Sequence, residues 1–486
     1  MRWLPRAFRA APTLVFVALL SGCATNPATG EKNVTLMSEA QEIQLGKEAD
    51  PQVRQEMGVY DDAALQQYVE RIGQRLARVS ERPDLPWHFT VVDQPAVNAF
   101  ALPGGFIYIT RGILPYLNDE AQLAGVLGHE IGHVTARHAA QQYTAQTGTG
   151  LGLVLLSIFV PETRPFQDVA QQAAGLLFLK YSRDDEIQAD GLGVRYASRA
   201  GWQPAGVQQM LETLSRLEQA EGSHRGVPNW LSTHPAPADR VQKVNAAVQA
   251  ADAPGRDYVT DRAAYLGQVD GIVFGDDPSQ GILRGSTFLH RDLRFSLTFP
   301  SGWTVQNSRE QVVSKAPDRN DFVLLELVSN PSGSLQRVAQ SSMGGAGWRQ
   351  IDGGMTEVNG LPAYVGTYQG TMQGLGPVVT RAAHVGYNDR VYVIAGLAPA
   401  DDFRGVENEF NQAIRSFRPL SAAQAEDIRA NRVELYTVRS GDTWDSIARR
   451  SAGAAALTPA TLAIMNGSAP GQPPRAGERI KIVVAG

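Results

Sequence analysis

The chain is poor in cysteine, in histidine and in blocks of like charge. Its 486 residues contain one cysteine and eight histidines, and the formal net charge is -5. A single cysteine excludes an internal disulfide and a thiolate metal cluster, so any metal site must be built from histidines and carboxylates. No run of Lys or Arg is present, and this argues against nucleic acid as a partner. At this length we expect about two to four folded domains.

The N-terminus has the pattern of an export signal. Three arginines precede the apolar run "TLVFVALL", Thr13 to Leu20, which is too short to span a bilayer. The run leads into "LSGC", so the lone cysteine, Cys23, follows at once. A lone cysteine can be a nucleophile or a buried thiol, but this position resembles the lipobox of bacterial lipoproteins. The resemblance implies a lipid on Cys23 and, since Ala24 follows in place of Asp, an outer-membrane location.

Hydrophobic periodicity predicts the elements that follow a turn-rich tether. Residues 38–80 have helical spacing, residues 87–92 alternate as a strand, and residues 98–114 have the pattern of a hairpin that turns at "PGG". A helix begins near Asp119. The apolar run over residues 150–160 is about half as long as a membrane span, so we expect a buried helix or, alternatively, a lip at the membrane interface. Further helical patterns cover residues 167–199 and 204–220.

The stretch "LGHEIGHVTARH" on the predicted helix holds three of the eight histidines. Residues four apart lie on one helix face, so His129 and His133 can bind one zinc ion while Glu130 handles the water. A chance H-E-x-x-H is expected on the order of 0.01 times in a chain of this composition. Gly128 and Gly132 each cost roughly 1 kcal/mol within a helix, and we expect another backbone to pack closely there. The alternative is an ordinary charged helix.

His138, the third histidine of this stretch, does not fit the same zinc ion. In a continuing helix it lies about 140° around the axis from His133 and about 180° from His129. The metzincin pattern breaks the helix with a glycine, but Ala136 and Ala139 occupy the corresponding positions here. We expect His138 to be a surface residue or a contact of a ligand.

A third ligand must therefore come from another element. In "YSRDDEIQADGLG", Glu186 and Asp190 stand four residues apart on a predicted helix. One carboxylate can bind zinc while the other orients a ligand histidine. The alternative is a solvated acidic face, since Asp184 and Asp185 are adjacent. Helical geometry leaves both interpretations open.

Four motifs in order, "NAFALPGG", "LGHEIGHVTARH", "YSRDDEIQADGLG" and "STHPAPADR", resemble the HtpX/CAAX-prenyl-protease family of gluzincin zinc metallopeptidases, most of all its BepA-type periplasmic members. The resemblance covers about residues 45–250. It implies one zinc ion and a general base that later protonates the leaving amine. The implied ligands are His129, His133 and Glu186, the base is Glu130, and the partner of a ligand histidine is Asp190.

The last of these motifs and the hairpin carry further implied roles. His234 would stabilise the oxyanion, or act as a fourth ligand that holds the enzyme off; the alternative is a plain loop residue. Arg240 would neutralise the oxyanion or anchor the acidic residues. The hairpin resembles the family's edge strand, which pairs with an extended substrate through Asn98, Ala99 and Phe100. Such relatives often carry helical repeats of about 34 residues, and this chain shows none, so docking would use the later domains.

The C-terminal half has a different pattern. Residues 285–420 alternate as strands followed by an amphipathic helix, and Phe299, Pro300, Gly302 and Trp303 loosely resemble sandwich domains of the PsbP type. His290 and His384 are isolated, and we expect them to be structural or surface residues. The last fifty residues contain "YTVRSGDTWDSIARR", "LTPATLAIMNG" and "PRAGERIKIV". These stretches resemble a LysM domain, which binds glycans that contain N-acetylglucosamine. That resemblance makes peptidoglycan a partner, with an inert spacer as the alternative; the candidate glycan contacts are Asp442, Thr443 and Asn466.

The sequence therefore predicts an α+β multidomain protein. We expect a zinc endopeptidase, lipid-anchored at the periplasmic face of the outer membrane, that cleaves unfolded or misassembled proteins. The alternatives are a latent assembly factor without proteolysis and, less in keeping with the motifs, a peptidoglycan hydrolase. The predicted segments are a signal peptide (1–22), a tether (23–44), a mainly helical protease with a small sheet (45–252), a connector (253–284), an α+β domain (285–420), a linker (421–434) and a βααβ LysM domain (435–485).

Overall fold

The computed structural model describes residues 23–30, 32–35, 37–142, 181–221, 230–234, 238–252, 255–328, 331–372, 374–451, 457–469 and 471–485. The predicted signal peptide, the apolar run over 150–160 and the start of the helical pattern over 167–199 lie outside these residues. Within the described part, no helix combines the length and the apolar character that a membrane crossing requires.

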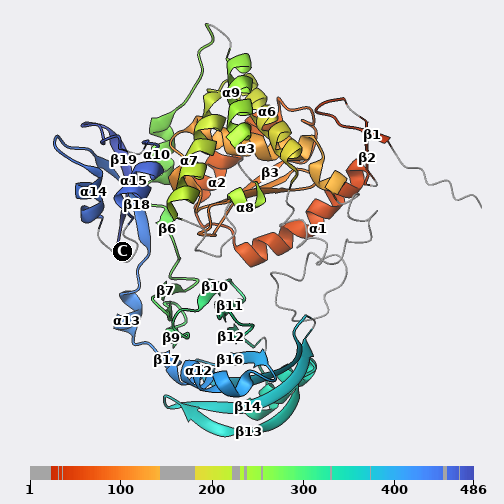
Figure 1. Ribbon diagram of the computed structural model, residues 1–486, viewed down its shortest axis with the longest axis vertical. Helices are drawn as coiled ribbons and strands as arrows, with labels where there is room; N and C mark the ends of the chain where they lie inside the picture. Colours follow the sequence, from red (N-terminus) through yellow and green to blue (C-terminus); the bar gives the residue numbers. More distant parts are fainter. Residues whose placement is uncertain are drawn as a thin grey trace, which may run out of the picture.

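A helical region with one small sheet carries the metal motif (Figure 1). Its sheet has the order β3-β5-β4, in which β3 and β5 are parallel and β4 forms an antiparallel hairpin with β5. The predicted strand and hairpin are confirmed, and the hairpin turns at Gly104 and Gly105, both with positive φ. The elements are α1 (Glu39–Met57), α2 (Ala63–Ala77), β3 (His88–Val92), β4 (Ala99–Leu102), β5 (Phe106–Thr110), α3 (Glu120–Thr135), α6 (Arg183–Ala200), α7 (Ala205–Glu221), α8 (Trp230–Thr233) and α9 (Ala238–Ala251).

Helix α3 begins where the sequence predicts, since the Asp119 side chain caps it by accepting from the Gln122 N–H. Every residue of α3 from Ala121 to Thr135 is buried. A Cβ on Gly128 would lie 3.2 Å from Gly193 Cα, and one on Gly132 would lie 2.9 Å from the Ala189 carbonyl oxygen. These glycines let α3 and α6 approach backbone to backbone, which confirms the expectation drawn from their cost in a helix.

The N-terminal segment differs from a loose tether. Its hairpin of β1 (Cys23–Thr25) and β2 (Lys32–Val34) precedes α1, which begins at Glu39 inside the predicted tether. Asn26, Thr35 and Met37 are buried. The segment therefore packs against the body of the protein.

The C-terminal sheet contains a strand that the βααβ prediction omits. Its order is β19-β18-β6, in which β6 (Val273–Phe274) comes from the predicted connector. Because β6 pairs with the start of β18 (Asn431–Thr437), the chain between them forms an insertion. The other elements here are α10 (Arg262–Val269), α13 (Ala422–Glu426), α14 (Trp444–Arg450), α15 (Pro459–Met465) and β19 (Arg479–Val484).

The inserted region has its own core, whereas the peptidase and C-terminal regions share one continuous core. Figure 1 shows the inserted region as a separate body joined through β6 and β18. Its long sheet is antiparallel, in the order β10-β11-β12-β16-β15-β14-β13, and a second sheet has the order β17-β9-β8-β7. Its helices are α11 (Leu335–Gly345) and α12 (Phe403–Ser416), and its strands are β7 (Ile282–Arg284), β8 (Thr287–His290), β9 (Phe295–Thr298), β10 (Thr304–Asn307), β11 (Gln311–Lys315), β12 (Phe322–Leu327), β13 (Arg349–Val358), β14 (Leu361–Met372), β15 (Gly376–Tyr387), β16 (Arg390–Pro399) and β17 (Arg418–Pro419).

Candidate metal centre

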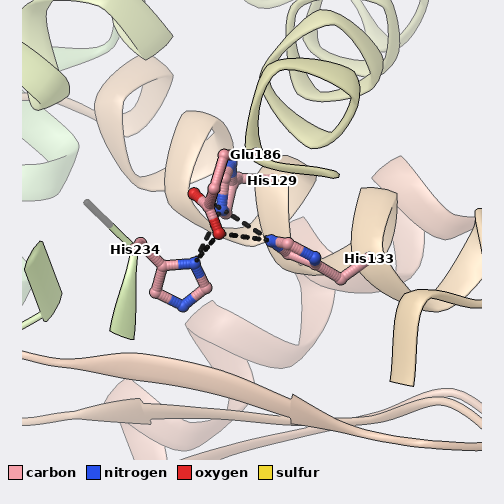
Figure 2. A group of neighbouring side chains, drawn as sticks. All are labelled: His129, His133, Glu186 and His234. Atoms are coloured by element: carbon pink, nitrogen blue, oxygen red, sulfur yellow. Dashed lines mark hydrogen bonds and ion pairs between the residues drawn. The ribbon is translucent and has the colours of Figure 1, made fainter. Parts of the chain in front are cut away.

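Four predicted residues converge at the crossing of α3 and α6. One ligand atom from each of His129, His133, Glu186 and His234 lies within 4.8 Å of the others, and all four side chains are buried. Figure 2 shows the carboxylate of Glu186 between the three imidazoles. His129 and His133 come from α3, Glu186 from the first turn of α6, and His234 directly follows α8.

Asp190 and Arg240 hold His129 in place. Asp190 Oδ1 lies 2.9 Å from His129 Nδ1, and Arg240 Nε donates to Asp190 Oδ2 at 2.5 Å. Burial raises the pKa of Asp190, but the Arg240 guanidinium outweighs this and holds the pKa below its ordinary value. An ionised Asp190 only accepts, so His129 Nδ1 donates and His129 Nε2 keeps its lone pair.

Arg240 also binds the other acid of α6. Its Nη1 lies 2.7 Å from Glu186 Oε2 and donates to the His234 carbonyl oxygen at 3.1 Å. Arg240 is fully buried, so of its two predicted roles the structure supports anchoring the acidic residues. Burial raises the pKa of Glu186, but the interaction with His234 and the Arg240 guanidinium outweighs burial and lowers that pKa.

His234 joins the ligand group and does not remain a plain loop residue. Its Nδ1 lies 2.8 Å from Glu186 Oε1, and its ring stacks on Trp230 with the centroids 4.8 Å apart. Burial alone would lower the pKa of His234, but the carboxylates of Glu186 and Glu130 outweigh burial and raise it.

Glu130 lies beside the ligand group with one oxygen unused. Its Oε1 is 3.7 Å from His234 Nε2 and accepts from the Trp230 indole N–H at 3.4 Å. Its Oε2 is buried and has no hydrogen-bond partner among the described residues. Sequence reasoning missed Trp230, because an indole in a poorly periodic segment gives no motif signal.

The geometry that sets His138 apart from the ligands needs a correction. Helix α3 ends at Thr135, and Arg137 has a φ of 61°, so the assumption of a continuing helix was wrong. His138 still lies outside the ligand group, as expected, and it contacts a ligand: its Nδ1 is 2.9 Å from His133 Nδ1. Burial lowers the pKa of both rings, most strongly for His133. Tyr181, which sequence reasoning also missed, stacks on His133 at a centroid distance of 3.9 Å.

The donor set fits a metal cation. His129 Nε2 and His133 Nε2 lie 3.0 Å apart, and a nitrogen lone pair directed at a second nitrogen is unfavourable unless a proton or cation lies between them. Three imidazoles and one carboxylate form a set that suits zinc and similar transition metals, not the oxygen-seeking magnesium or calcium. Residues His129, His133, Glu186 and His234 would hold the ion.

Among the residues that the structure describes, the predicted substrate strand β4 is an outer strand of the small sheet, and the Trp230 N–H bonds the Val97 carbonyl just before it. Thr110 N–H donates to the Asn98 carbonyl at 3.0 Å, so the backbone of alternate residues, Asn98 and Phe100, faces β5. The backbone of Ala99 and Ala101 faces the outer edge, and the Asn98 side chain accepts from the Ala99 N–H. Ala101 is therefore a better candidate for pairing with a peptide than Asn98 or Phe100, whose ring stacks on Tyr108.

A small pocket lies between this edge and one ligand of the metal centre. Its lining includes Ala101 and Leu102 of β4 together with His133. The rest of the lining is mostly apolar, with one ion pair between Glu42 and Arg137.

The three candidate glycan residues make hydrogen bonds within their own domain. Asp442 accepts from the Tyr436 hydroxyl at 2.6 Å and from the Arg439 N–H at 2.7 Å. Thr443 caps α14. The amide of Asn466 makes two bonds to the Lys481 backbone and one to the Leu462 carbonyl. Asn466 is 7% exposed, so its amide is not free for a ligand.

The two isolated histidines join no ligand group among the described residues. His384 is fully buried, and its Nε2 lies 2.8 Å from the Ser342 hydroxyl. His290 Nδ1 accepts from the Leu293 N–H at 3.2 Å. Both are structural, as the sequence predicts.

Two segments of this chain are similar to known protein families. Residues 63–248 match the model of peptidase family M48, and residues 436–483 match that of the LysM domain. The beta-barrel assembly-enhancing protease of Escherichia coli (strain K12) is 33% identical over 226 residues, which are 45% of this chain and 46% of that protein. The mitochondrial metalloendopeptidase OMA1 of Arabidopsis thaliana is 35% identical over 179 residues, which are 37% of this chain and 35% of that protein. The chain thus spans about half the length, or less, of these relatives.

Solved structures resemble the chain only weakly. Cyanobacterial PsbP (CyanoP) from Synechocystis sp. PCC 6803 matches with a TM-score of 0.24 and 14% identity, over 28% of this chain and 95% of that chain. At this TM-score the PsbP-like fold of residues 285–420 stays a prediction. The two sequence matches and the converging donor set lead to one assignment: residues 63–248 of this chain are a peptidase family M48 domain, and residues 436–483 are a LysM domain.

Proposed function

We propose that this chain is a zinc endopeptidase that cleaves unfolded or misassembled proteins of the bacterial cell envelope. The observation that carries the proposal is the buried donor group of His129, His133, Glu186 and His234 with Glu130 beside it. Zinc, when bound, polarises a peptide carbonyl and lowers the pKa of water.

The residues around the ion would transfer the proton and position the ligands. The free oxygen of Glu130 accepts a proton from the attacking water and passes it to the leaving amine. The Trp230 indole, which donates to the other oxygen, keeps that carboxylate turned toward the site. Asp190 and Arg240 hold His129 and Glu186 in their ligand positions.

The substrate class follows from the outer edge of β4. Backbone pairing at a sheet edge requires an extended peptide, and the pocket beside His133 is mostly apolar. Folded proteins present few extended apolar segments, so unfolded chains are the better substrates. One relative is named as a protease that enhances β-barrel assembly, and this supports an envelope setting.

The setting we propose is the periplasmic face of the outer membrane. A lipid on Cys23 would anchor the chain, and the LysM domain would hold it near peptidoglycan. The buried, bonded amide of Asn466 favours a glycan contact through other LysM groups.

The direct test compares wild type with Glu130→Gln on unfolded casein and on a folded protein. We expect wild type to cleave casein and the variant to lose about 10²- to 10⁴-fold in kcat, the range for a proton-transfer group. Zinc content should stay the same in both. Equal cleavage by the variant would reject the peptidase mechanism, and release of fragments from purified peptidoglycan would favour the hydrolase alternative.

A second candidate, a latent assembly factor, is favoured by the position of His234. As a fourth ligand it leaves no coordination position open for water, and catalytic zinc sites need one. His234→Ala should then raise casein cleavage while zinc stays bound. A fall in kcat would instead support the role of His234 in stabilising the oxyanion.

A further inference from the structure

We propose that His138 and Gln188 fix the tautomer of His133, so that the lone pair of His133 Nε2 faces the metal. The inference rests on the metal site of the proposed function, but it does not depend on the reaction. His138 lies beyond the end of α3 and is 2% exposed. It would be a positioning residue, acting through His133.

The direction of the hydrogen bonds is set at the Gln188 end. Gln188 Oε1 is a carbonyl oxygen, which can only accept, and it lies 2.8 Å from His138 Nε2. Asp185 Oδ1, another acceptor, lies 3.5 Å from the same nitrogen. His138 Nε2 therefore carries the proton, and the neutral ring keeps a lone pair on Nδ1.

That lone pair determines the tautomer of the ligand. His138 Nδ1 and His133 Nδ1 are 2.9 Å apart, so one must donate and the other accept. Since His138 Nδ1 accepts, His133 Nδ1 donates, and His133 Nε2 is left unprotonated. His133 Nε2 lies 3.5 Å from Glu186 Oε1, inside the ligand group. Tyr181, stacked on the His133 ring, holds the plane of that ring.

The two ligand histidines of α3 thus depend on different partners. His129 donates to a carboxylate that Arg240 keeps ionised. His133 donates to a neutral imidazole, whose own orientation depends on an amide. Gln188 is linked to the ligand His133 through two hydrogen bonds, so a change at Gln188 should alter metal affinity.

The network extends to the N-terminal hairpin. Asn26 Nδ2 donates to Gln188 Oε1 at 3.4 Å, and Asn26 is 3% exposed. Asn26 stands three residues after Cys23, the predicted lipidation site. The segment that would lie at the membrane therefore contacts the amide that orients His138. At 3.4 Å this bond is weak, and we place Asn26 at the minor end of the network.

The test measures zinc affinity of the mature chain by competition with a chelator. His138→Phe and Gln188→Leu should each weaken zinc binding about 10- to 100-fold, the range for partners of metal ligands. His138→Gln supplies an amide oxygen that can accept from His133 Nδ1, so it should recover most of the affinity. Asn26→Ala should cost only a few-fold. Gln44→Leu makes the same chemical change at an exposed helical glutamine and should have no effect.

Two readouts separate positioning from misfolding and from failure of the proposed function. Nitrogen-15 NMR of the zinc-free protein should show the His138 proton on Nε2, where Gln188 Oε1 accepts it, and Gln188→Leu should move it to Nδ1. Thermal unfolding with chelator present should match wild type; if Q188L lowers that Tm, Gln188→Met serves in its place. Unchanged zinc affinity in both H138F and Q188L would overturn the inference. Zinc affinity that depends on His138 in a chain that leaves casein intact would uphold it and reject the peptidase.

Discussion

The polar residues of the metal centre and those of the LysM domain differ in where their bonding atoms point. In the metal centre, ligand atoms from three elements lie within 4.8 Å of one another, and Glu130 Oε2 has no partner among the described residues. In the LysM domain, side-chain oxygens of Asp442 and Asn466 accept hydrogen bonds from backbone N–H groups of the same domain. Both sets belong to recognisable motifs. The comparison teaches that ligand atoms that converge on one point mark a ligand site. Motif residues whose polar atoms bond the backbone of their own domain instead stabilise the fold.

Among these residues, we expect a change at the ligand Glu186 to have the largest effect. Structural zinc binding is worth about 10–16 kcal/mol, so each of four ligands carries roughly 3–4 kcal/mol. Glu186→Gln should therefore weaken zinc binding about 10²- to 10³-fold, measured by chelator competition. Asp184→Asn, an exposed acid on the same helix turn, is the matched control and should leave the affinity unchanged. Equal losses in both variants would mean that the acidic face acts only through its charge.

His384 tests a buried histidine that has no converging partners. Burial lowers the pKa of His384 from 6.5 to about 4. As the pH falls, the unfolded chain takes up this proton before the folded chain does, so stability is complete above about pH 6.5 and decreases toward pH 4. This lowered pKa corresponds to about 3 kcal/mol of stability lost at pH 4. Urea unfolding of the inserted region at pH 7 and pH 4 measures this loss together with that of His290, whose pKa burial also lowers to about 4. His384→Phe should reduce the total loss by the share of His384. A variant with the same pH slope as wild type would refute the assignment.

Asn466 sharpens the comparison from the LysM side. Its buried amide makes three hydrogen bonds to backbone groups, so Asn466→Ala should lower the free energy of unfolding by about 1–3 kcal/mol. Binding to peptidoglycan in a pull-down should be unchanged below the Tm. Loss of binding without loss of stability would return Asn466 to the glycan site.

Thr443 should give the smallest effect. It caps α14 by accepting from the Ser446 N–H at 3.1 Å, and removing such a cap costs about 1 kcal/mol. Thr443→Ala should lower the Tm slightly, as measured by calorimetry, and Thr443→Ser should restore it. A stable T443A variant that no longer binds peptidoglycan would make Thr443 a ligand contact.

The sequence could predict those parts of the site that depend on helix periodicity. The spacing of His129 and His133 places them on one face, and the cost of Gly128 and Gly132 predicts the close crossing with α6. Glu186 could be ranked above a solvated acid only by family resemblance, because spacing alone does not place α6 beside α3.

Other contacts could not be predicted, because they depend on where irregular segments run. Trp230 stacks on His234 from a segment without a periodic pattern. Tyr181 stacks on His133 from a position directly before α6, although the sequence predicted helix through residues 167–199. His138 turns back onto His133 because Arg137 adopts a positive φ, a conformation that the sequence does not signal for arginine. The pairing of β6 with β18 joins residues more than 150 positions apart. The sequence therefore did not predict that the region between the connector and the linker is an insertion.

The central claim is that four side chains of this chain form one zinc site with Glu130 beside it. A crystal structure of the zinc-loaded protein, with anomalous scattering measured at the zinc edge, tests it most directly. We predict one zinc ion held by His129, His133 and Glu186, with His234 within reach of the ion and His138 bonded to His133. A zinc ion bound elsewhere, or held without Glu186, would contradict the account.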